Sequence, residues 1–331
     1  MVTHGSLFSG IGGFDLGLER AGIRTMWMCE IEPAARKVLA HHWPDTPCHG
    51  DVTEVDGARL EPVDVVTFGS PCQDLSVAGQ RAGLDGARSG LFHEALRIAA
   101  EMKEATSGAH PRLLVWENVP GALSSNSGRD FAAVLDAMAD VGAVDIGWRV
   151  LDAQWFGVAQ RRRRVFVIAD LGGRRAGQVL TLAQGSAWSP RPRRQEGSRV
   201  AALTANGVGA GGGPDDNAAQ AGHLIPDVIG PLMARGAGPD DNAAQAGHLI
   251  PDVIGPLMAR SGMQEKFNDQ LIPESGTRVR RLTPVECERL QGFPDGWTEP
   301  AGADTHRYRC LGNAVCVNIA AWLGHNITEA L

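Results

Sequence analysis

Leu7-Phe8-Ser9-Gly10-Ile11-Gly12-Gly13-Phe14 is the stretch that decides the fold of this 331-residue chain. Apolar residues lead into it, and the helical pattern Asp15-Leu16-Gly17-Leu18-Glu19-Arg20 follows it and ends at Gly22. Glycine permits positive φ and lets a ligand approach the backbone closely. The order strand, glycine turn, helix is therefore typical of an α/β fold that binds a nucleotide-like ligand.

The next apolar run, Arg24 to Cys29, ends in Glu30. This is about the spacing at which a carboxylate hydrogen-bonds the ribose hydroxyls of a bound nucleoside. A phosphate-binding loop is not indicated, because no Gly-Lys-Ser or Gly-Lys-Thr follows the glycines. The turn and the carboxylate together predict a cofactor of the nucleoside type.

Further apolar runs alternate with helical patterns. We expect strands at 24–29, 63–69, 112–116, 147–152 and 164–169, and the clearest helices at 92–104 and 131–141. This alternation predicts a mostly parallel sheet with helices on both faces.

A cysteine and a glutamate stand just after two of these runs. The run Val63 to Gly69 leads to Cys72, and Arg112 to Trp116 leads directly to Glu117. Groups beyond the carboxyl ends of parallel strands share one crevice, so this thiol and this carboxyl could act on one substrate. Taken alone, each also has an ordinary structural interpretation, Cys72 as a small buried residue and Glu117 as a helix cap.

In their order along the chain, these features resemble the motifs of the DNA cytosine-5 methyltransferase family. The matching segments are spread over nearly the whole chain: Phe8–Gly13, Glu30, Gly50-Asp51-Val52, Pro71-Cys72-Gln73, Glu117-Asn118-Val119, Gln160–Arg164, Arg280–Pro284 with Gln291–Pro294, and Gly312–Val315. One such motif can occur by chance, but an ordered set of this length would not.

The resemblance implies a Rossmann-like α/β sheet that uses S-adenosyl-L-methionine, with a smaller, loop-rich target recognition domain inserted near the C-terminal part. The residues implied to bind the cofactor are Phe8, Ser9, Gly10, Gly12, Gly13, Glu30, Ile31, Asp51, Val52, Asn313 and Val315.

It also implies a reaction on double-stranded DNA. Cys72, as thiolate, would add to carbon 6 of a flipped-out cytosine, and the methyl group would then pass to carbon 5. Glu117 would hydrogen-bond the ring nitrogen and the exocyclic amine, and Arg164 would hold the carbonyl oxygen of the base. The implied catalytic set is Cys72, Glu117, Arg162 and Arg164, and Gln73, Ser76, Arg81, Arg88 and Gln160 are expected to contact DNA. The glycine-rich stretch 77–90 resembles the family's mobile loop, and its alternative is an ordinary connection.

Charge and cysteine usage are compatible with this prediction. The formal net charge of −7 is unusual for a nonspecific DNA-coating protein, so DNA contact would need local positive charge. Arginines provide such clusters at 161–164 with 174 and 175, at 191–199, and at 278–281. The six cysteines show no CxxC or Cys/His ligand spacing, so neither a metal site nor a disulfide framework is indicated. No signal peptide or long apolar span is evident, and we expect a cytoplasmic monomer with no membrane contact.

The expected organisation is a catalytic and cofactor-binding domain over residues 1–171, a target recognition domain over 172–277, and a return to the catalytic domain over 278–331. Within the middle segment, Gly213 to Arg235 recurs unchanged as Gly238 to Arg260. Two identical copies are too few for a solenoid and indicate a recent tandem duplication. The second copy either alters or extends the DNA site or loops out harmlessly, and we favour looping out.

Two alternative functions remain open. One is an RNA cytosine-5 methyltransferase, although that related group has a smaller insert and a Cys-Phe-Thr stretch that this chain lacks. The other is a DNA-binding protein of the same fold whose catalysis is impaired, which retention of Cys72, Glu117 and Arg164 disfavours. Amino-methylating DNA enzymes are disfavoured because no Asp-Pro-Pro-Tyr or Ser-Pro-Pro-Tyr occurs. A separately encoded restriction endonuclease is a candidate partner that the sequence does not identify.

Overall fold

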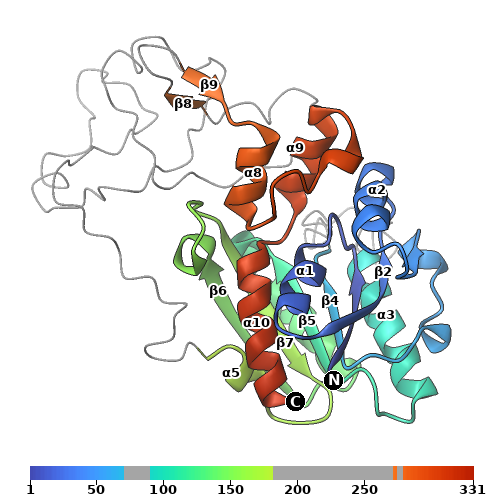
Figure 1. Ribbon diagram of the computed structural model, residues 1–331. Helices are drawn as coiled ribbons and strands as arrows, with labels where there is room; N and C mark the ends of the chain where they lie inside the picture. The colour runs from blue at the N-terminus through green and yellow to red at the C-terminus, as the bar shows by residue number, and fades with distance from the viewer. Residues whose placement is uncertain (71–89, 182–270, 274–278) are drawn as a thin grey trace, which may run out of the picture.

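A seven-stranded sheet forms the centre of the protein in the computed structural model, which describes residues 1–70, 90–181, 271–273 and 279–331 (Figure 1). Its strands are β1 (Thr3–Leu7), β2 (Arg24–Cys29), β3 (Cys48–His49), β4 (Val65–Phe68), β5 (Leu113–Asn118), β6 (Asp145–Asp152) and β7 (Arg163–Asp170). The order is β3-β2-β1-β4-β5-β7-β6. The pairs from β3 to β5 are parallel, and β7 is antiparallel to β5 and β6. The predicted mostly parallel sheet is confirmed.

The helices in the described residues pack on the two faces of this sheet or beyond it. They are α1 (Gly13–Arg20), α2 (Pro33–His42), α3 (Gly90–Ala105), α4 (Arg129–Asp140), α5 (Ala176–Val179), α8 (Pro284–Gln291), α9 (Asp304–Asn313) and α10 (Val317–Ala330), with short 3-10 turns η1 (Val52–Glu54), η2 (Gly57–Arg59), η5 (Pro120–Leu123), η6 (Ser125–Gly128), η7 (Ala153–Phe156) and η8 (Glu299–Ala301). The core of α3 and α4 lies on one face, and that of α1, α5 and α10 on the other. Beyond the sheet, α2, α8 and α9 share a third cluster.

The central strands are mostly apolar because both of their faces are buried, and their few polar side chains, such as His4, Ser6 and Thr67, are buried as well. In β4, Val66 and Phe68 belong to the core beneath α3 and α4, whereas Val65 belongs to the core beneath α1 and α10. Successive side chains of a strand point to opposite faces, so one short apolar run serves both cores. This explains why the strand pattern was a continuous run rather than an alternation.

Two boundaries differ from those expected. Strand β5 continues through Glu117 and Asn118, because both residues pair with β7, so Glu117 is part of the strand and does not cap a helix. Residues 172–181, which we assigned to the recognition domain, include α5, whose Ala176 and Val179 are buried in the core of the catalytic sheet. The described chain therefore stays on this sheet as far as Thr181, and the rest of the insert, with both copies of the duplication, lies outside the described residues except for β8 (Leu271–Pro273).

Helices α1 and α10 pack unusually closely. A Cβ at Gly17 would lie 2.4 Å from the Cβ of Ala320 and 2.7 Å from the carbonyl oxygen of Val317. Since real Cβ atoms do not approach other atoms this closely, the helices would have to move apart.

We therefore expect Gly17→Ala to lower the free energy of unfolding by about 1–3 kcal/mol, the usual cost of overpacking a core. The matched control is Gly177→Ala in α5, because a Cβ there meets nothing within 4 Å. That change should be neutral or slightly stabilising, since alanine favours helix. Urea unfolding of both variants checks this, and equal losses of stability would contradict the close packing.

A histidine and a carboxyl are fully buried between β1 and α1. Nδ1 of His4 lies 3.8 Å from Oδ1 of Asp15. Burial lowers the pKa of His4 to about 3 and raises the pKa of Asp15 to about 7. Both groups are therefore held in their neutral forms over much of the acidic range, and no ion pair forms between them there.

This burial predicts an effect of Asp15→Asn that depends on pH. Between about pH 4 and 7 the folded protein keeps the Asp15 proton that the unfolded chain releases, so the Asp15 contribution to stability falls as pH rises. His4 acts oppositely between about pH 3 and 6.5, because only the unfolded chain binds its proton. Removing Asp15 leaves the His4 contribution alone. The stability of Asp15→Asn relative to wild type should thus increase from pH 4 to 7 and then level off, as measured by urea unfolding at several pH values. A difference independent of pH would contradict it.

Candidate active site

Glu117 and Arg164 meet at the carboxyl edge of β5. The antiparallel pairing sets Asn118 opposite Val165, which brings the start of β7 beside the end of β5. Nε of Arg164 lies 3.0 Å from Oε1 of Glu117, and the two side chains are only 12% and 11% exposed. Oε1 of Glu117 makes no hydrogen bond in the described structure, so the contact is an ion pair, and water screens it weakly because both groups are mostly buried.

The chain that leaves β4 is anchored beside this pair. Nε1 of Trp116 donates to Oγ of Ser70 at 3.1 Å, and Nδ2 of Asn118 donates to the Ser70 carbonyl at 3.5 Å. Gly69 lies next to the carboxyl, because a Cβ there would be in van der Waals contact with Oε2 of Glu117, at 3.4 Å. Sequence reasoning missed Ser70 and Trp116, whose only signal was their place beside the two motifs.

Several predicted residues lie outside the described part of the chain. They are Cys72, Gln73, Ser76, Arg81 and Arg88, together with residues 77–89 of the loop-like stretch. Their roles stay predictions.

Arg162 and Gln160, from the arginine-rich motif, are both buried. The guanidinium of Arg162 donates to the carbonyls of Gly312 at 3.3 Å and Ala314 at 2.8 Å, so it binds the closing motif. Gln160 is 0% exposed, and neither its amide oxygen nor its amide nitrogen has a hydrogen-bond partner in the described structure. In this arrangement Arg162 binds the backbone of the closing motif, and the Gln160 side chain is shielded from solvent.

Glu30 and the glycine turn are joined directly. Oε2 of Glu30 accepts from the backbone N–H of Gly10, and Oε1 accepts from that of Glu32, each at 2.7 Å. Burial raises the pKa of Glu30. Gly10 has φ +59°, and a Cβ there would meet nothing within 4 Å, so the turn presents an open side next to a carboxylate. At Gly13 a side chain would not fit, because a Cβ there would lie 2.5 Å from the Val315 carbonyl oxygen.

The other predicted cofactor residues surround the same edge of the sheet. Asp51 caps η1 by accepting from the N–H and hydroxyl of Thr53, which lowers its pKa, and Val52 is buried. Ile31 is 65% exposed beside Glu30. Phe8 has a positive φ of +56°. The Ser9 hydroxyl donates a hydrogen bond to the Cys29 carbonyl. Asn313 is the last residue of α9, and its side chain is exposed. A carboxylate, an open glycine turn and an exposed aliphatic side chain fit the ribose and adenine of a nucleoside cofactor.

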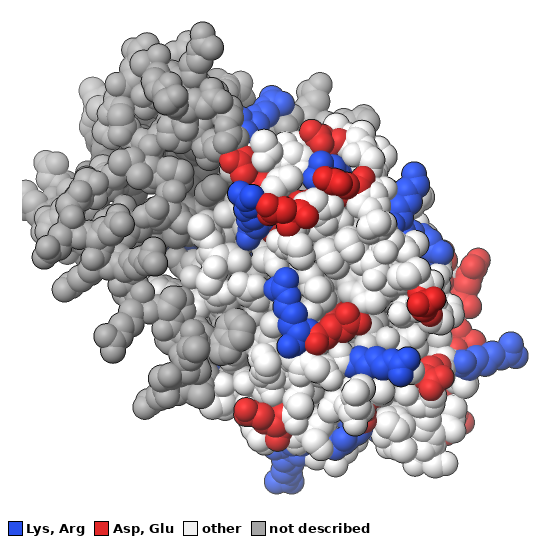
Figure 2. Space-filling model, viewed as in Figure 1, with Lys and Arg blue, Asp and Glu red and all other residues white. Residues whose placement is uncertain are grey.

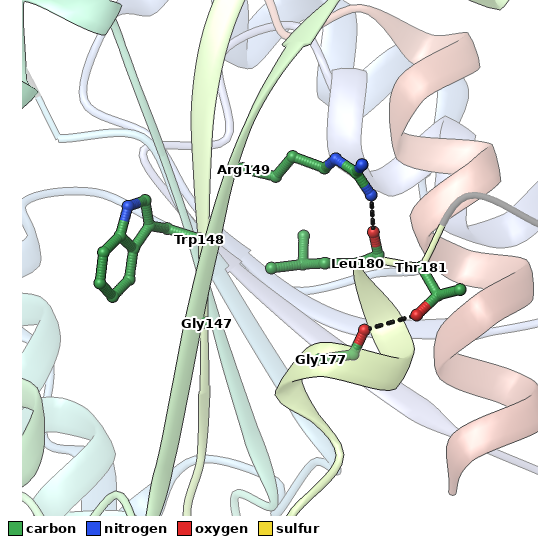
Figure 3. A pocket seen from close by; sticks show the side chains of 6 residues that line it. All are labelled: Gly147, Trp148, Arg149, Gly177, Leu180 and Thr181. Atoms are coloured by element: carbon green, nitrogen blue, oxygen red, sulfur yellow. Dashed lines mark hydrogen bonds between the residues drawn. The ribbon is translucent and has the colours of Figure 1, made fainter.

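Other surface features lie apart from this edge. A shallow pocket between β6 and α5 is lined by Gly147, Trp148, Arg149, Gly177, Leu180 and Thr181, and Arg149 donates to the Leu180 carbonyl there at 2.6 Å (Figure 3). On the face shown in Figure 2, positive and negative side chains are interspersed. In the described residues, no helix is long and apolar enough to cross a membrane, and no three His, Cys, Asp or Glu side chains are grouped to hold a metal ion.

The chain is similar to known proteins of one family. A sequence model of the family described as C-5 cytosine-specific DNA methylase matches residues 2–202 and 237–329. The chain belongs to this family. It is thus a DNA methyltransferase that uses S-adenosyl-L-methionine, as the sequence motifs predicted.

Relatives of this C-5 cytosine-specific DNA methylase include the type II methyltransferase M.Eco47II of Escherichia coli, 30% identical over 98% of this chain and 78% of that protein. M2.BsuMI of Bacillus subtilis is 29% identical over 98% of this chain and 75% of that protein. A protein of Escherichia phage P1, named DNA N-6-adenine-methyltransferase, is 30% identical over the whole chain, which spans 61% of its length.

Solved structures share the fold. A DNA modification methyltransferase described as encoded within an E. coli prophage matches with a TM-score of 0.62 at 20% identity, over 100% of this chain and 99% of that one. Entamoeba histolytica EhMeth matches with a TM-score of 0.62 at 16% identity, over 99% of this chain and 98% of that one.

Proposed function

We propose that this DNA methylase transfers a methyl group to carbon 5 of a flipped-out cytosine through a covalent adduct of Cys72. The Glu117–Arg164 pair carries the proposal: a carboxyl and a guanidinium that lie 3.0 Å apart and are mostly buried support a joint role in holding the target base. Cys72 follows the anchored Ser70 by two residues.

Each group has a distinct task. Addition of the Cys72 thiolate to carbon 6 makes carbon 5 nucleophilic, while Glu117 hydrogen-bonds the ring nitrogen and the exocyclic amine and offsets the developing charge. Arg164 orients Glu117 and holds the base carbonyl. S-adenosyl-L-methionine supplies the methyl group. Removal of the carbon 5 proton by a base, for which water is a candidate, then expels Cys72 as thiolate.

Arg162 and Gln160 receive revised roles in this proposal. The bonds of Arg162 to the Gly312 and Ala314 carbonyls favour a positioning role, since they hold the closing motif against Gly13 of the cofactor turn. The burial of Gln160 disfavours direct DNA contact.

The name of the phage P1 relative suggests adenine as an alternative target. We favour cytosine because the nucleophile and carboxyl motifs are those of the cytosine chemistry and because no Asp-Pro-Pro-Tyr or Ser-Pro-Pro-Tyr occurs. We also propose a monomeric, cytoplasmic enzyme on double-stranded DNA, with a separately encoded restriction endonuclease as a candidate partner.

Expression in a methylation-deficient host tests the target directly. Bisulfite sequencing should show cytosines protected within one short consensus, and detection of N6-methyladenine should give no signal. Methyladenine without protected cytosine would overturn the proposal. DNA binding without any methylation would favour the impaired DNA-binding protein, and transfer to RNA alone would favour the RNA enzyme.

The duplication leads to a separate prediction. The family match omits residues 203–236, which contain the first copy, and resumes before the second. This gap supports the interpretation that one copy is surplus. Deleting residues 213–237 should therefore leave both the methylated consensus and the rate of transfer unchanged, as bisulfite sequencing and a methyl-transfer assay would report. A changed consensus would show that the duplicated copy takes part in recognition.

A further inference from the structure

A chain of buried hydroxyls connects Asp15 of α1 with the end of β2, beneath the cofactor turn. Oγ of Ser6 donates to Oδ1 of Asp15 at 2.8 Å and lies 2.5 Å from Oγ of Ser9. Oγ of Ser9 accepts from the backbone N–H of Cys29 at 3.1 Å, one residue before Glu30. The link thus runs from a fully buried carboxyl to the backbone of Cys29, the residue before Glu30, whose carboxylate accepts from the Gly10 N–H.

Ser9 is the residue at which this chain meets the turn. Its carbonyl accepts from the N–H of Gly12, and its own N–H donates to the Cys29 carbonyl, each at 3.0 Å. Its hydroxyl has one proton and three acceptors within reach: Oγ of Ser6, the Ser6 carbonyl at 3.1 Å and the Cys29 carbonyl at 3.2 Å. The acceptor that the Ser9 hydroxyl uses depends on whether the Ser6 hydroxyl donates to it or accepts from it.

Asp15 decides the direction of donation along this chain. An ionised carboxyl only accepts, so Ser6 donates to it and Ser9 is free to donate to Ser6. A protonated carboxyl can donate to Ser6, in which case Ser6 donates to Ser9 and Ser9 donates to the Cys29 carbonyl. The carboxyl therefore determines how firmly Ser9 joins the turn to the end of β2.

The burial of the Asp15 carboxyl does not stabilise the fold. Oδ2 of Asp15 is buried without a hydrogen-bond partner in the described residues. The groups that face it are His4 on β1, which burial keeps neutral, Glu19 on α1, which repels a negative charge, and Cys48 on β3, on which it acts electrostatically. A buried carboxyl without a cation is costly, and such groups are more common at functional sites than in ordinary cores.

We propose that Asp15 is a positioning residue for S-adenosyl-L-methionine, which acts through Ser6 and Ser9 to hold the glycine turn against the end of β2. In this position the Gly10 N–H and the Glu30 carboxylate stay aligned before the cofactor arrives. The inference rests on the cofactor that the family uses and is independent of the covalent step at Cys72.

Binding of S-adenosyl-L-methionine to the full chain without DNA, measured by isothermal titration calorimetry, tests the proposal. Asp15→Ala should raise Kd about tenfold, the effect of losing one well-placed hydrogen bond, and Ser6→Ala should do the same. The double variant should bind no more weakly than either single one, because both changes break one chain. Asp15→Asn should restore most of the affinity, since its amide both donates and accepts.

Steady-state kinetics and a matched control complete the test. KM for the cofactor should rise in Asp15→Ala while kcat and KM for DNA stay unchanged, and Asp136→Asn, an exposed carboxyl on α4, should change nothing. If Asp15→Ala fails to fold, Ser6→Ala and Asp15→Asn decide by the same readouts. Unchanged Kd in Ser6→Ala, additive losses in the double variant, or equal weakness of Asn and Ala at position 15 would each overturn the proposal.

Discussion

Cys72→Ser is expected to abolish methyl transfer, with a loss of more than about 10³-fold, the scale on which removal of a catalytic nucleophile acts. A serine hydroxyl has almost no anion near neutral pH, whereas a cysteine in positive surroundings is readily a thiolate. The measurement is transfer of tritiated methyl groups to duplex DNA. Cys48→Ser is the matched control, because Cys48 lies half-buried in β3 and has no place in the proposed reaction.

A trapping experiment separates loss of the nucleophile from loss of DNA or cofactor binding. Duplex DNA with fluorine at carbon 5 of the target cytosine lacks the proton whose loss completes the reaction, so wild type should remain covalently attached to it. Cys72→Ser should still bind this DNA without becoming attached. Wild-type rates of transfer in Cys72→Ser, or a covalent complex that forms in its place, would show that the nucleophile is another residue.

Glu117→Gln should lower the rate of a single turnover by about 10²–10⁴-fold at saturating DNA and cofactor, the usual contribution of a positioned acid or base. Glutamine keeps the shape of the side chain but cannot exchange a proton with the base. Arg164→Ala should lower the rate by about 10²–10³-fold, because it leaves Glu117, 11% exposed, without its cation.

A conservative substitution and a control variant test whether the loss of rate comes from the Glu117–Arg164 pair. Arg164→Lys should recover only part of the loss, since an ammonium keeps the charge but not the planar geometry of the guanidinium. Glu104→Gln, at an exposed glutamate of α3, should leave the rate unchanged. Additive effects of Glu117→Gln and Arg164→Ala in a double variant would contradict joint action, because residues that act as a unit are not additive.

The bounds of strands and helices were predicted closely where the hydrophobic pattern of the segment itself sets them. Strand β2 has the expected bounds, Arg24–Cys29, and the helix expected over 92–104 is α3, Gly90–Ala105. Prediction was less accurate where partners far along the chain set a boundary. Glu117 is in a strand because β7 pairs with it, and residues 172–181 stay with the catalytic sheet because α5 packs on it.

The sequence by itself determined the order of the motifs and the α/β class, and it supplied the groups that we propose to carry the chemistry, because these depend on residue type and local spacing. Only the tertiary structure decided which of those groups meet. The contact of Glu117 with Arg164, the binding of Arg162 to the closing motif and the link from Asp15 through Ser6 to Ser9 all join residues from different strands or helices. Such contacts depend on strand order, on register and on which face each side chain takes, and a shift of one residue in any strand would turn its side chains to the opposite face.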